Sequence, residues 1–266
     1  MKIIDVSKHN KTINWDDVKN QIDGAILRLG WIGNKENHTI DPQFERNYNE
    51  CKRLKIPIGV YVYNYCIHES TVLSGAKWTI KQLQGKDLEL PVYFDIEEES
   101  MRNMGKEKLT NLVIAFNTEI ENAGFWAGIY ANRNWYNNYL HKELLIKRYT
   151  SWIAHFQENT ELYRNEYDML QYTSKGNIDG IVTNVDLNIM YRDLILDIQK
   201  WKNKKVENTI QQNENTTQQN EIEYIVKKGD CLSKIAKKFN TTVQAIAEKN
   251  GITNVDLIYE NQKLII

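Results

Sequence analysis

The chain has 266 residues, 41% of them hydrophobic and 11% aromatic, which is enough for one large domain and a smaller one. A net charge of −1 excludes the broad basic surface expected of a nucleic-acid-binding protein. Three widely spaced cysteines without a CxxC pair indicate neither a disulfide framework nor a zinc site, and the five histidines show no metal-ligand spacing. No apolar run reaches membrane-spanning length, and "MKIIDVSKHN" has no apolar export signal. We therefore expect a soluble protein without metal or cofactor, made in the cytoplasm without a signal peptide.

Short runs rich in Ile, Val and Tyr alternate with helical patterns through the first 200 residues. The clearest predicted strands are residues 2–6, 24–31, 56–65 and 90–97, and weaker ones cover 125–132, 151–156, 167–173 and 182–188. One helical stripe begins at Phe44, behind Asp41 and Pro42 as predicted N-cap and first helical position. Another runs from Leu109 to Ile120 and is closed by Gly124.

Eight strands with intervening helices predict an α/β fold of the closed, TIM-like β/α barrel type. Little room for helices remains between the later strands, so we expect an irregular barrel. A doubly wound open sheet is the competing architecture.

A change in composition divides the chain after residue 202. Residues 203–221 lack Gly, Pro and aromatic residues and consist mainly of Asn, Gln, Thr and charged residues. Such a segment buries too little apolar surface to offset its ordering entropy, so we interpret it as a flexible polar linker. An exposed helical continuation of 191–202 is the alternative. The sequence thus predicts a barrel domain over 1–202 and a small module over 222–266.

Four acidic residues fall at the ends of predicted strands. Asp95 and Glu97 share one face of "LPVYFDIE", Asp5 ends the first strand, and Asp186 lies in the last. The first and last strands of a closed barrel are neighbours, so we expect the four carboxylates to converge on one mouth. Crowding and partial burial raise the pKa of at least one of them, which then donates a proton near neutral pH. Cleavage through an oxocarbenium-like state needs such a proton donor beside ionised carboxylates.

Aromatic side chains near the same strand ends suit sugar rings, because their faces are apolar and their edges polar. We predict a substrate cleft lined by Arg28, Tyr63, Tyr65, Tyr130, Trp152 and Gln171. Tyr61, lower on the same strand, is expected to fill the barrel core. Arg28 either holds an acid or a substrate group, or forms a structural salt bridge.

Six segments resemble glycoside hydrolase family 25, the muramidases of bacteria and their phages. In order they are "DVSKHNKTINWDDVK", "AILRLGW", "DPQFERNYNECKRLKIPIGVYVYNY", "PVYFDIE", "GIYANRNWY" and "LQYTSKGNIDGIVTNVDLN", spanning about the first 195 residues. The resemblance implies an irregular β/α barrel with Glu97 as acid/base residue and Asp5, Asp95 and Asp186 as supporting aspartates. The family often has glycine where this chain has Lys11.

The resemblance also implies hydrolysis of the β-1,4 bond between N-acetylmuramic acid and N-acetylglucosamine, with net retention. Glu97 would protonate the leaving oxygen while Asp95 orients the substrate's own 2-acetamido group; a direct Asp nucleophile is the alternative. Two other functions compete: a non-catalytic wall-binding protein, and a chitinase or glucosaminidase acting on N-acetylglucosamine polymers.

Residues 223–266 resemble a single LysM module. Helical stripes over 232–239 and 243–247 lie between the strands "EYIV" and "KLII", which predicts a β-α-α-β domain. The family binds N-acetylglucosamine-containing glycans, which implies contacts at Gly229, Asp230, Cys231, Leu232 and Ile258. Together the two resemblances imply a phage endolysin, a lysozyme that reaches host peptidoglycan after release from the cytoplasm. The sequence leaves its oligomeric state open.

Overall fold

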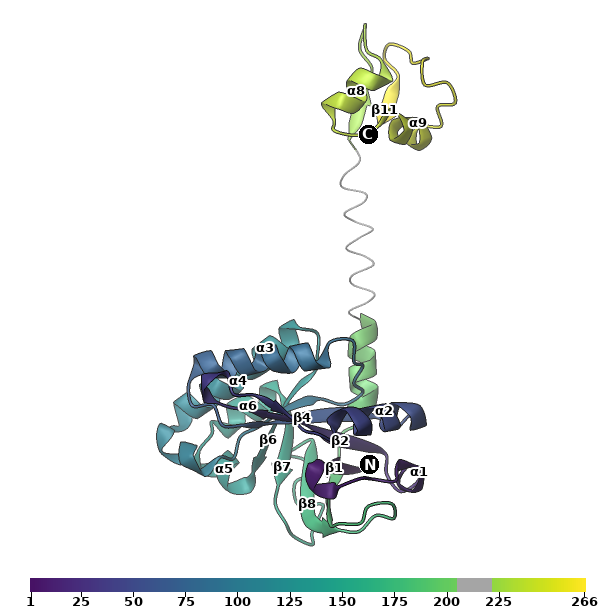
Figure 1. Ribbon diagram of the computed structural model, residues 1–266. Coiled ribbons are helices and arrows are strands. Elements are labelled where there is room, and N and C mark those ends of the chain that lie inside the picture. Colours follow the sequence, from purple (N-terminus) through teal and green to yellow (C-terminus); the bar gives the residue numbers. More distant parts are fainter. Residues whose placement is uncertain (205–221) are drawn as a thin grey trace. The chain divides into compact units, whose positions relative to one another are not determined.

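The computed structural model describes residues 1–204 and 222–266 and divides into two compact units, Met1–Lys200 and Trp201–Ile266 (Figure 1). Residues 194–204 are helical, so the first two residues of the predicted linker continue the preceding helix. The rest of that predicted linker, 205–221, lies outside the described residues. Within the described part, every helix is too short or too polar to span a bilayer.

Eight strands of the first unit close into a barrel. They are β1 (Lys2–Val6), β2 (Gly24–Ile32), β4 (Ile58–Asn64), β5 (Val92–Asp95), β6 (Ala127–Asn132), β7 (Thr150–Ala154), β8 (Met169–Gly176) and β9 (Val185–Met190), with the short β3 (Thr39–Ile40) beside β2. The sheet order is β1-β9-β8-β7-β6-β5-β4-β2-β3, and β1 also pairs with β2. This second pairing closes the sheet, so the predicted barrel is confirmed and the open doubly wound sheet is excluded.

The barrel is mixed, which makes it irregular. Strand β9 runs antiparallel to both β8 and β1, whereas the other neighbours around the barrel are parallel. Only a short loop joins β8 to β9, and a parallel connection would need a longer crossover. The beginning of β9 therefore lies at the same mouth as the carboxyl ends of the parallel strands.

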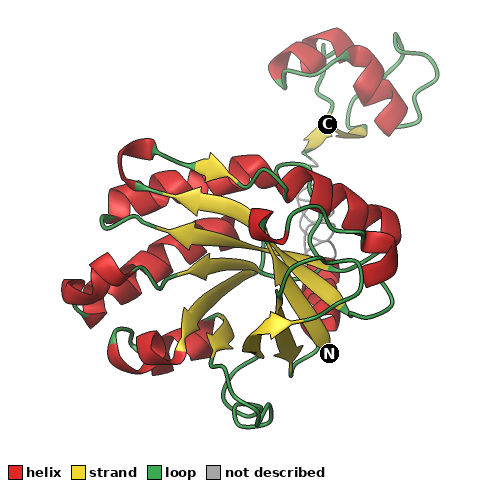
Figure 2. Cartoon of the chain, turned by 60° about the horizontal axis from the view of Figure 1, so that its bottom comes forward, coloured by secondary structure: helices red, strands yellow, loops and turns green. Residues whose placement is uncertain are grey.

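Helices surround the strands on the outside (Figure 2). They are α1 (Trp15–Val18), α2 (Phe44–Leu54), α3 (Glu69–Leu83), α4 (Lys106–Asn122), α5 (Arg133–Asn138) and α6 (Lys142–Arg148), with 3-10 turns η1 (Lys8–Asn10), η2 (Asn34–Glu36) and η3 (Glu99–Met104). Gly124, at φ 90°, follows α4 in the left-handed region, as predicted.

The predicted start of α2 was wrong by two residues. Its N-cap is Gln43, and Asp41 precedes the helix. The Asp41 carboxylate instead accepts hydrogen bonds from the backbone N–H groups of Gln43, at 2.9 Å, and Lys8, at 3.0 Å. Asp41 therefore stabilises a turn before the helix and ties it to the loop after β1.

Two apolar layers support the barrel. Side chains such as Leu27, Val60 and Phe94 pack between the strands and the helices. The interior holds a second cluster that includes Tyr93 and Trp152. Gly128 leaves room for the interior cluster, because a Cβ there would lie 2.5 Å from the Tyr93 ring.

The second unit is a β-α-α-β domain, as predicted. It consists of β10 (Glu223–Ile225), α8 (Leu232–Lys238), α9 (Val243–Lys249) and β11 (Lys263–Ile265). The two strands pair antiparallel, and both helices contribute buried side chains to one small core that includes Ile235, Ile246 and Leu264.

Candidate active site

Four carboxyl groups gather at one mouth of the barrel. Asp5 and Asp186 are direct register partners on β1 and β9. Asp95 ends β5, and Glu97 lies two residues beyond the strand, which therefore ends earlier than predicted. Asp5 and Asp95 are only 5% and 3% exposed, whereas Glu97 and Asp186 are half-buried. The mouth thus has a buried pair of acids and a more accessible pair.

A chain of buried hydrogen bonds holds Asp5. Its Oδ2 accepts from Asn188 Nδ2 at 2.8 Å and from Gln171 Nε2 at 3.0 Å. The Trp152 indole donates to Asn188 Oδ1 at 2.8 Å, and the Tyr130 hydroxyl donates to Gln171 Oε1 at 3.0 Å. Both amides are therefore oriented with their N–H groups toward the acid, so Asp5 is held in one position.

This network places three residues of the predicted cleft below the acids. Trp152 is 1% exposed, and its ring packs edge-on against Tyr61, Tyr93 and Tyr130 in the barrel interior. Gln171 and Tyr130 are also buried. These side chains support the acidic residues from beneath and offer no open ring face to a sugar. Tyr61 packs against the interior core, as expected.

Burial and mutual repulsion raise the pKa values of the Asp5–Asp186 pair. Burial and then the charge of Asp186 raise the pKa of Asp5 to about 8, against the opposing effect of its two amide donors. Burial raises the pKa of Asp186 to about 6. The pair therefore carries fewer than two negative charges near neutral pH.

The pKa values of Asp95 and Glu97 are also raised, and burial is again the main cause. Burial, followed by the charge of Glu97, raises the pKa of Asp95 well above its ordinary value, and the Arg28 guanidinium opposes this. Burial also raises the pKa of Glu97, while a hydrogen bond from Asn132 Nδ2 to Glu97 Oε2, 3.4 Å long, opposes the shift. Among the described residues Asp95 Oδ1 has no hydrogen-bond partner. Both acids therefore hold a proton more readily than a free carboxyl group does, and Glu97 is the half-buried, more accessible one of the two.

An aromatic shelf formed by Trp31, Tyr63 and Tyr65 lies at the carboxyl ends of β2 and β4, beside Asp95 and Glu97. The rings of Tyr63 and Tyr65 have centroids 4.7 Å apart, and Trp31 meets Tyr65 edge-on at 5.6 Å. Tyr65 is 40% exposed, and the guanidinium of Arg28 lies 5.8 Å from the Tyr63 ring centroid. Tyr63 and Tyr65 thus present neighbouring rings near Arg28, and their contact with a sugar ring stays a prediction.

Sequence reasoning missed three side chains of this region. Trp31 ends the segment "AILRLGW", Asn132 is the last strand residue in "GIYAN", and Asn188 closes "VDLN". Each of the three lies at the end of a predicted strand or within it. That position in the sequence was the signal that could have identified them as residues of the site. A neutral amide draws less attention than an acid, although both asparagines here orient acids.

The predicted glycan-binding residues of the small domain separate into two groups. Asp230 Oδ2 accepts from the Lys227 backbone N–H at 2.9 Å and from the Tyr224 hydroxyl at 2.8 Å, so it stabilises a turn, and Cys231 occupies the N-cap of α8. Gly229 and Cys231 are exposed in that turn. Leu232 is buried in the domain core, and Ile258 packs against that core.

No cluster of three or more His, Cys, Asp or Glu side chains in residues 1–204 and 222–266 is arranged to hold a metal ion. Of the cysteines, Cys51 and Cys66 are buried and Cys231 is exposed, and all three are free thiols.

Comparison with known proteins now identifies the family. Residues 4–181 match glycosyl hydrolases family 25, and residues 224–266 match the LysM domain. The chain belongs to glycosyl hydrolases family 25. In this family 25 protein, the match covers the barrel from β1 to the loop before β9, and the LysM match covers most of the β-α-α-β domain.

Solved structures and curated proteins include several relatives. The modular autolysin LytC of Streptococcus pneumoniae is 29% identical with a TM-score of 0.63, over 71% of this chain and 46% of LytC. This chain thus spans less than half of LytC. The CTP1L endolysin, 22% identical with a TM-score of 0.64 over 75% of this chain and 69% of its own, shares the fold. The uncharacterized protein YegX of Escherichia coli O157:H7 is 24% identical over 70% of this chain and 68% of YegX.

Proposed function

We propose that the protein is a lysozyme that hydrolyses the β-1,4 bond between N-acetylmuramic acid and N-acetylglucosamine in peptidoglycan, with net retention. The observation that carries the proposal is the convergence of Glu97 and Asp95 with the Asp5–Asp186 pair at one barrel mouth. Membership of family 25 and the LysM domain support peptidoglycan as the polymer that is bound. LytC, the relative at 29% identity, has been solved in complex with a synthetic peptidoglycan ligand.

Glu97 is the proposed proton donor because it is the accessible member of its pair and burial raises its pKa. It protonates the glycosidic oxygen as the bond to C1 breaks. The carbonyl oxygen of the substrate's 2-acetamido group attacks C1 and forms a bicyclic oxazolinium ion. Asp95, two residues before Glu97 and close enough to feel its charge, orients the acetamido N–H and stabilises the positive charge.

The second step restores the enzyme. Glu97, now ionised, removes a proton from water, and the resulting hydroxide attacks C1 and opens the oxazolinium ring. Two displacements at C1 give net retention. A direct attack by Asp95 on C1 is the alternative, and a substrate whose acetamido group is replaced by hydroxyl separates the two: only a direct nucleophile keeps its rate on that substrate.

The first test is digestion of purified Gram-positive peptidoglycan by the wild type, Glu97→Gln and Glu99→Gln, with analysis of the new reducing ends. We expect muramic acid ends from the wild type and a rate at least about 1000-fold lower for Glu97→Gln, because the amide donates no proton. Glu99→Gln makes the same chemical change at an exposed residue paired with Arg102, and should keep nearly full activity.

Other outcomes would assign another function. New N-acetylglucosamine ends would mean a glucosaminidase, and faster cleavage of chitin than of peptidoglycan would mean a chitinase. Binding to walls without any fragments from the wild type would mean a non-catalytic wall-binding protein. Equal activity of Glu97→Gln and wild type would contradict the assignment of Glu97.

We further propose that the LysM domain binds N-acetylglucosamine-containing glycan and that the protein is a phage endolysin, released from the host cytoplasm to the wall. The turn around Gly229 and the fold shared with the CTP1L endolysin support this reading. The test is induced expression in a Gram-positive host with and without a pore-forming membrane protein. Lysis only with the pore supports release by a partner, whereas lysis without it would indicate an autolysin with its own export.

A further inference from the structure

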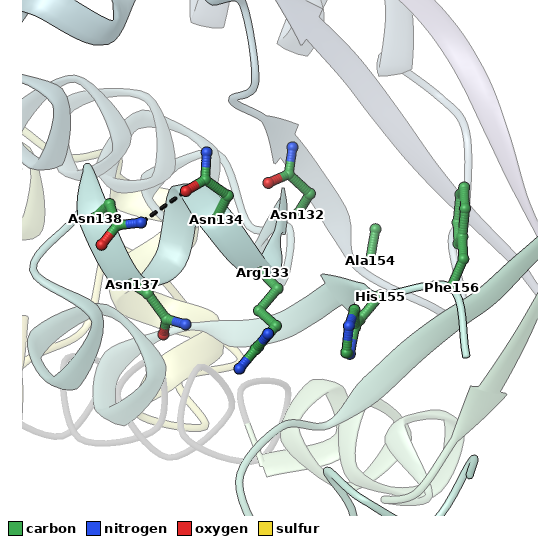
Figure 3. A pocket seen from close by; sticks show the side chains of 8 residues that line it. All are labelled: Asn132, Arg133, Asn134, Asn137, Asn138, Ala154, His155 and Phe156. Atoms are coloured by element: carbon green, nitrogen blue, oxygen red, sulfur yellow. Dashed lines mark hydrogen bonds between the residues drawn. The ribbon is translucent and has the colours of Figure 1, made fainter. Parts of the chain in front are cut away.

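A pocket of about 550 Å³ opens beside the acids, at the carboxyl ends of β6 and β7 (Figure 3). Its lining includes Asn132, Arg133 and Asn137 from the end of β6 and α5, and Ala154, His155 and Phe156 from the end of β7 and the following loop. Asn132 belongs to both sites, because its Nδ2 also donates to Glu97 Oε2. An occupant of the pocket therefore lies one side chain away from the proposed proton donor.

Arg133 brings to this pocket a positive charge that no carboxylate of the described residues pairs with. Other exposed arginines, such as Arg53 and Arg164, form ion pairs with carboxylates. The guanidinium of Arg133 forms no ion pair or hydrogen bond within residues 1–204 and 222–266, although the neighbouring mouth is rich in acids. Arg133 and His155 extend toward the same end of the pocket (Figure 3). Burial lowers the pKa of His155, and the positive charge of Arg133 lowers it further, which agrees with that placement.

His155 adds a second donor. The Tyr163 hydroxyl lies 2.9 Å from His155 Nδ1, and burial raises the pKa of Tyr163, so the phenol keeps its proton and can donate it to Nδ1. In the tautomer in which the phenol donates to Nδ1, the neutral imidazole carries its hydrogen on Nε2, which makes no hydrogen bond among the described residues. With His155 in that tautomer, both Arg133 and His155 present N–H donors to the pocket, an arrangement that favours a carboxylate.

The opposite wall is apolar. Phe156 is 56% exposed, an unusual position for a large hydrophobic side chain, and it lies across the pocket from α5 (Figure 3). A ligand that fits carries a carboxylate at one end and apolar groups beside it. Muramic acid has such a branch: a lactyl ether that ends either in a free carboxylate or in a peptide of small residues with carboxylates of its own.

We propose that this pocket binds a carboxylate of the branch on muramic acid, through Arg133 and His155, and so selects glycan by its substituent. The inference rests on the proposed function, since it concerns the same glycan. Two groups on muramic acid could supply this carboxylate: the free lactyl group and an attached peptide.

The test measures binding to the full-length protein, independently of hydrolysis. The probes are three N-acetylglucosaminyl-N-acetylmuramic acid disaccharides: one with a free lactyl carboxylate, one with an L-alanyl-D-glutamate branch, and one with the lactyl group as methylamide. Dissociation constants from NMR titration are compared for the wild type, Arg133→Gln, Arg133→Lys and Arg148→Gln. Arg148 is an exposed arginine on α6 outside the pocket, so its variant controls for the change in net charge.

We expect Arg133→Gln to weaken binding of one carboxylate-bearing probe about tenfold, and to leave the methylamide unchanged, because a charge-assisted hydrogen bond at an accessible site has about this effect. The affected probe identifies the source. Arg133→Lys should recover part of the loss, and Arg148→Gln should resemble the wild type. Equal effects of Arg133→Gln on all three probes, or none on any, would overturn the proposal. Wild-type binding with this pattern but without cleavage of peptidoglycan would overturn only the muramidase function.

Discussion

Lys11 adopts a backbone conformation that lysine rarely takes. It follows η1 at φ 58° and ψ −145°, a region populated mainly by glycine. The side chain is exposed, so no contact of its own explains the strain. The residue therefore stores unfavourable energy in the loop that follows Asp5.

Lys11→Gly should raise the free energy of unfolding by about 1 kcal/mol, because the strain that is relieved outweighs the added entropy of the unfolded chain. Urea unfolding measures the change. Lys55→Gly is the matched control: Lys55, at φ 58° and ψ 34°, lies in the ordinary left-handed region and costs less. A larger gain at Lys55 than at Lys11 would contradict this interpretation.

Asp5 should make stability fall as pH rises. Its pKa in the folded state is about 8, against an ordinary value of 3.8, so the folded state holds the proton more tightly than the unfolded state. The contribution of this tightly held proton to the free energy of unfolding is complete below about pH 4, and it is lost as pH rises toward 8. Asp5→Asn, which stays neutral, should therefore gain at least about 1 kcal/mol of stability relative to wild type between pH 5 and pH 8.

Urea midpoints at the two pH values measure this difference. Asp16→Asn is the control that should leave this difference as in wild type, because Arg53 lowers the pKa of the exposed Asp16 and the carboxylate stays ionised between pH 5 and pH 8 whether the chain is folded or unfolded. If wild type and Asp5→Asn lose the same stability between pH 5 and pH 8, the proton on Asp5 is not the cause.

At the scale of elements, the contact between β5 and β6 determines the floor of the site. Tyr93 precedes Asp95 by two residues, so both side chains point into the barrel. The Tyr93 ring lies against Gly128 of β6. Space at one glycine thus decides where a buried ring lies, and that ring supports the acid above it.

Gly128→Ala should destabilise the barrel by about 1–3 kcal/mol and reduce activity, because the new methyl group displaces the Tyr93 ring. Chemical unfolding and wall digestion measure the two effects. Adding Tyr93→Leu to Gly128→Ala should cost less than the sum of the single changes, since the leucine leaves room for the methyl. If the free-energy costs of the two substitutions simply add, the clash between the new methyl group and the Tyr93 ring is not the cause of the destabilisation.

At the scale of the whole molecule, the two compact units predict that catalysis and binding to insoluble walls can be separated. A chain ending at residue 202 should keep its kcat/KM on soluble glycan fragments, because the acids and the aromatic shelf all lie in the first unit. Its binding to insoluble walls should weaken about 10–100-fold, because one of two tethered binding sites is lost. Sedimentation with purified walls measures binding; equal sedimentation of both proteins would show that the LysM domain contributes nothing there.

The sequence by itself determined the eight strands, the mixed apolar and acidic character of "VYFDIE", and the β-α-α-β domain. Local periodicity and strand propensity carry this information, because they depend on neighbouring residues. It also implied that Asp5 and Asp186 are neighbours, which follows from closure of the barrel.

Only the tertiary structure decided the direction of β9, the burial of Trp152 and Gln171 beneath the acids, and the roles of Asn132 and Asn188 as amides that orient Glu97 and Asp5. These features depend on contacts between strands that lie far apart in the chain. The pocket at Arg133 and His155 has the same origin, because two separate strands must end side by side before their side chains form one cavity.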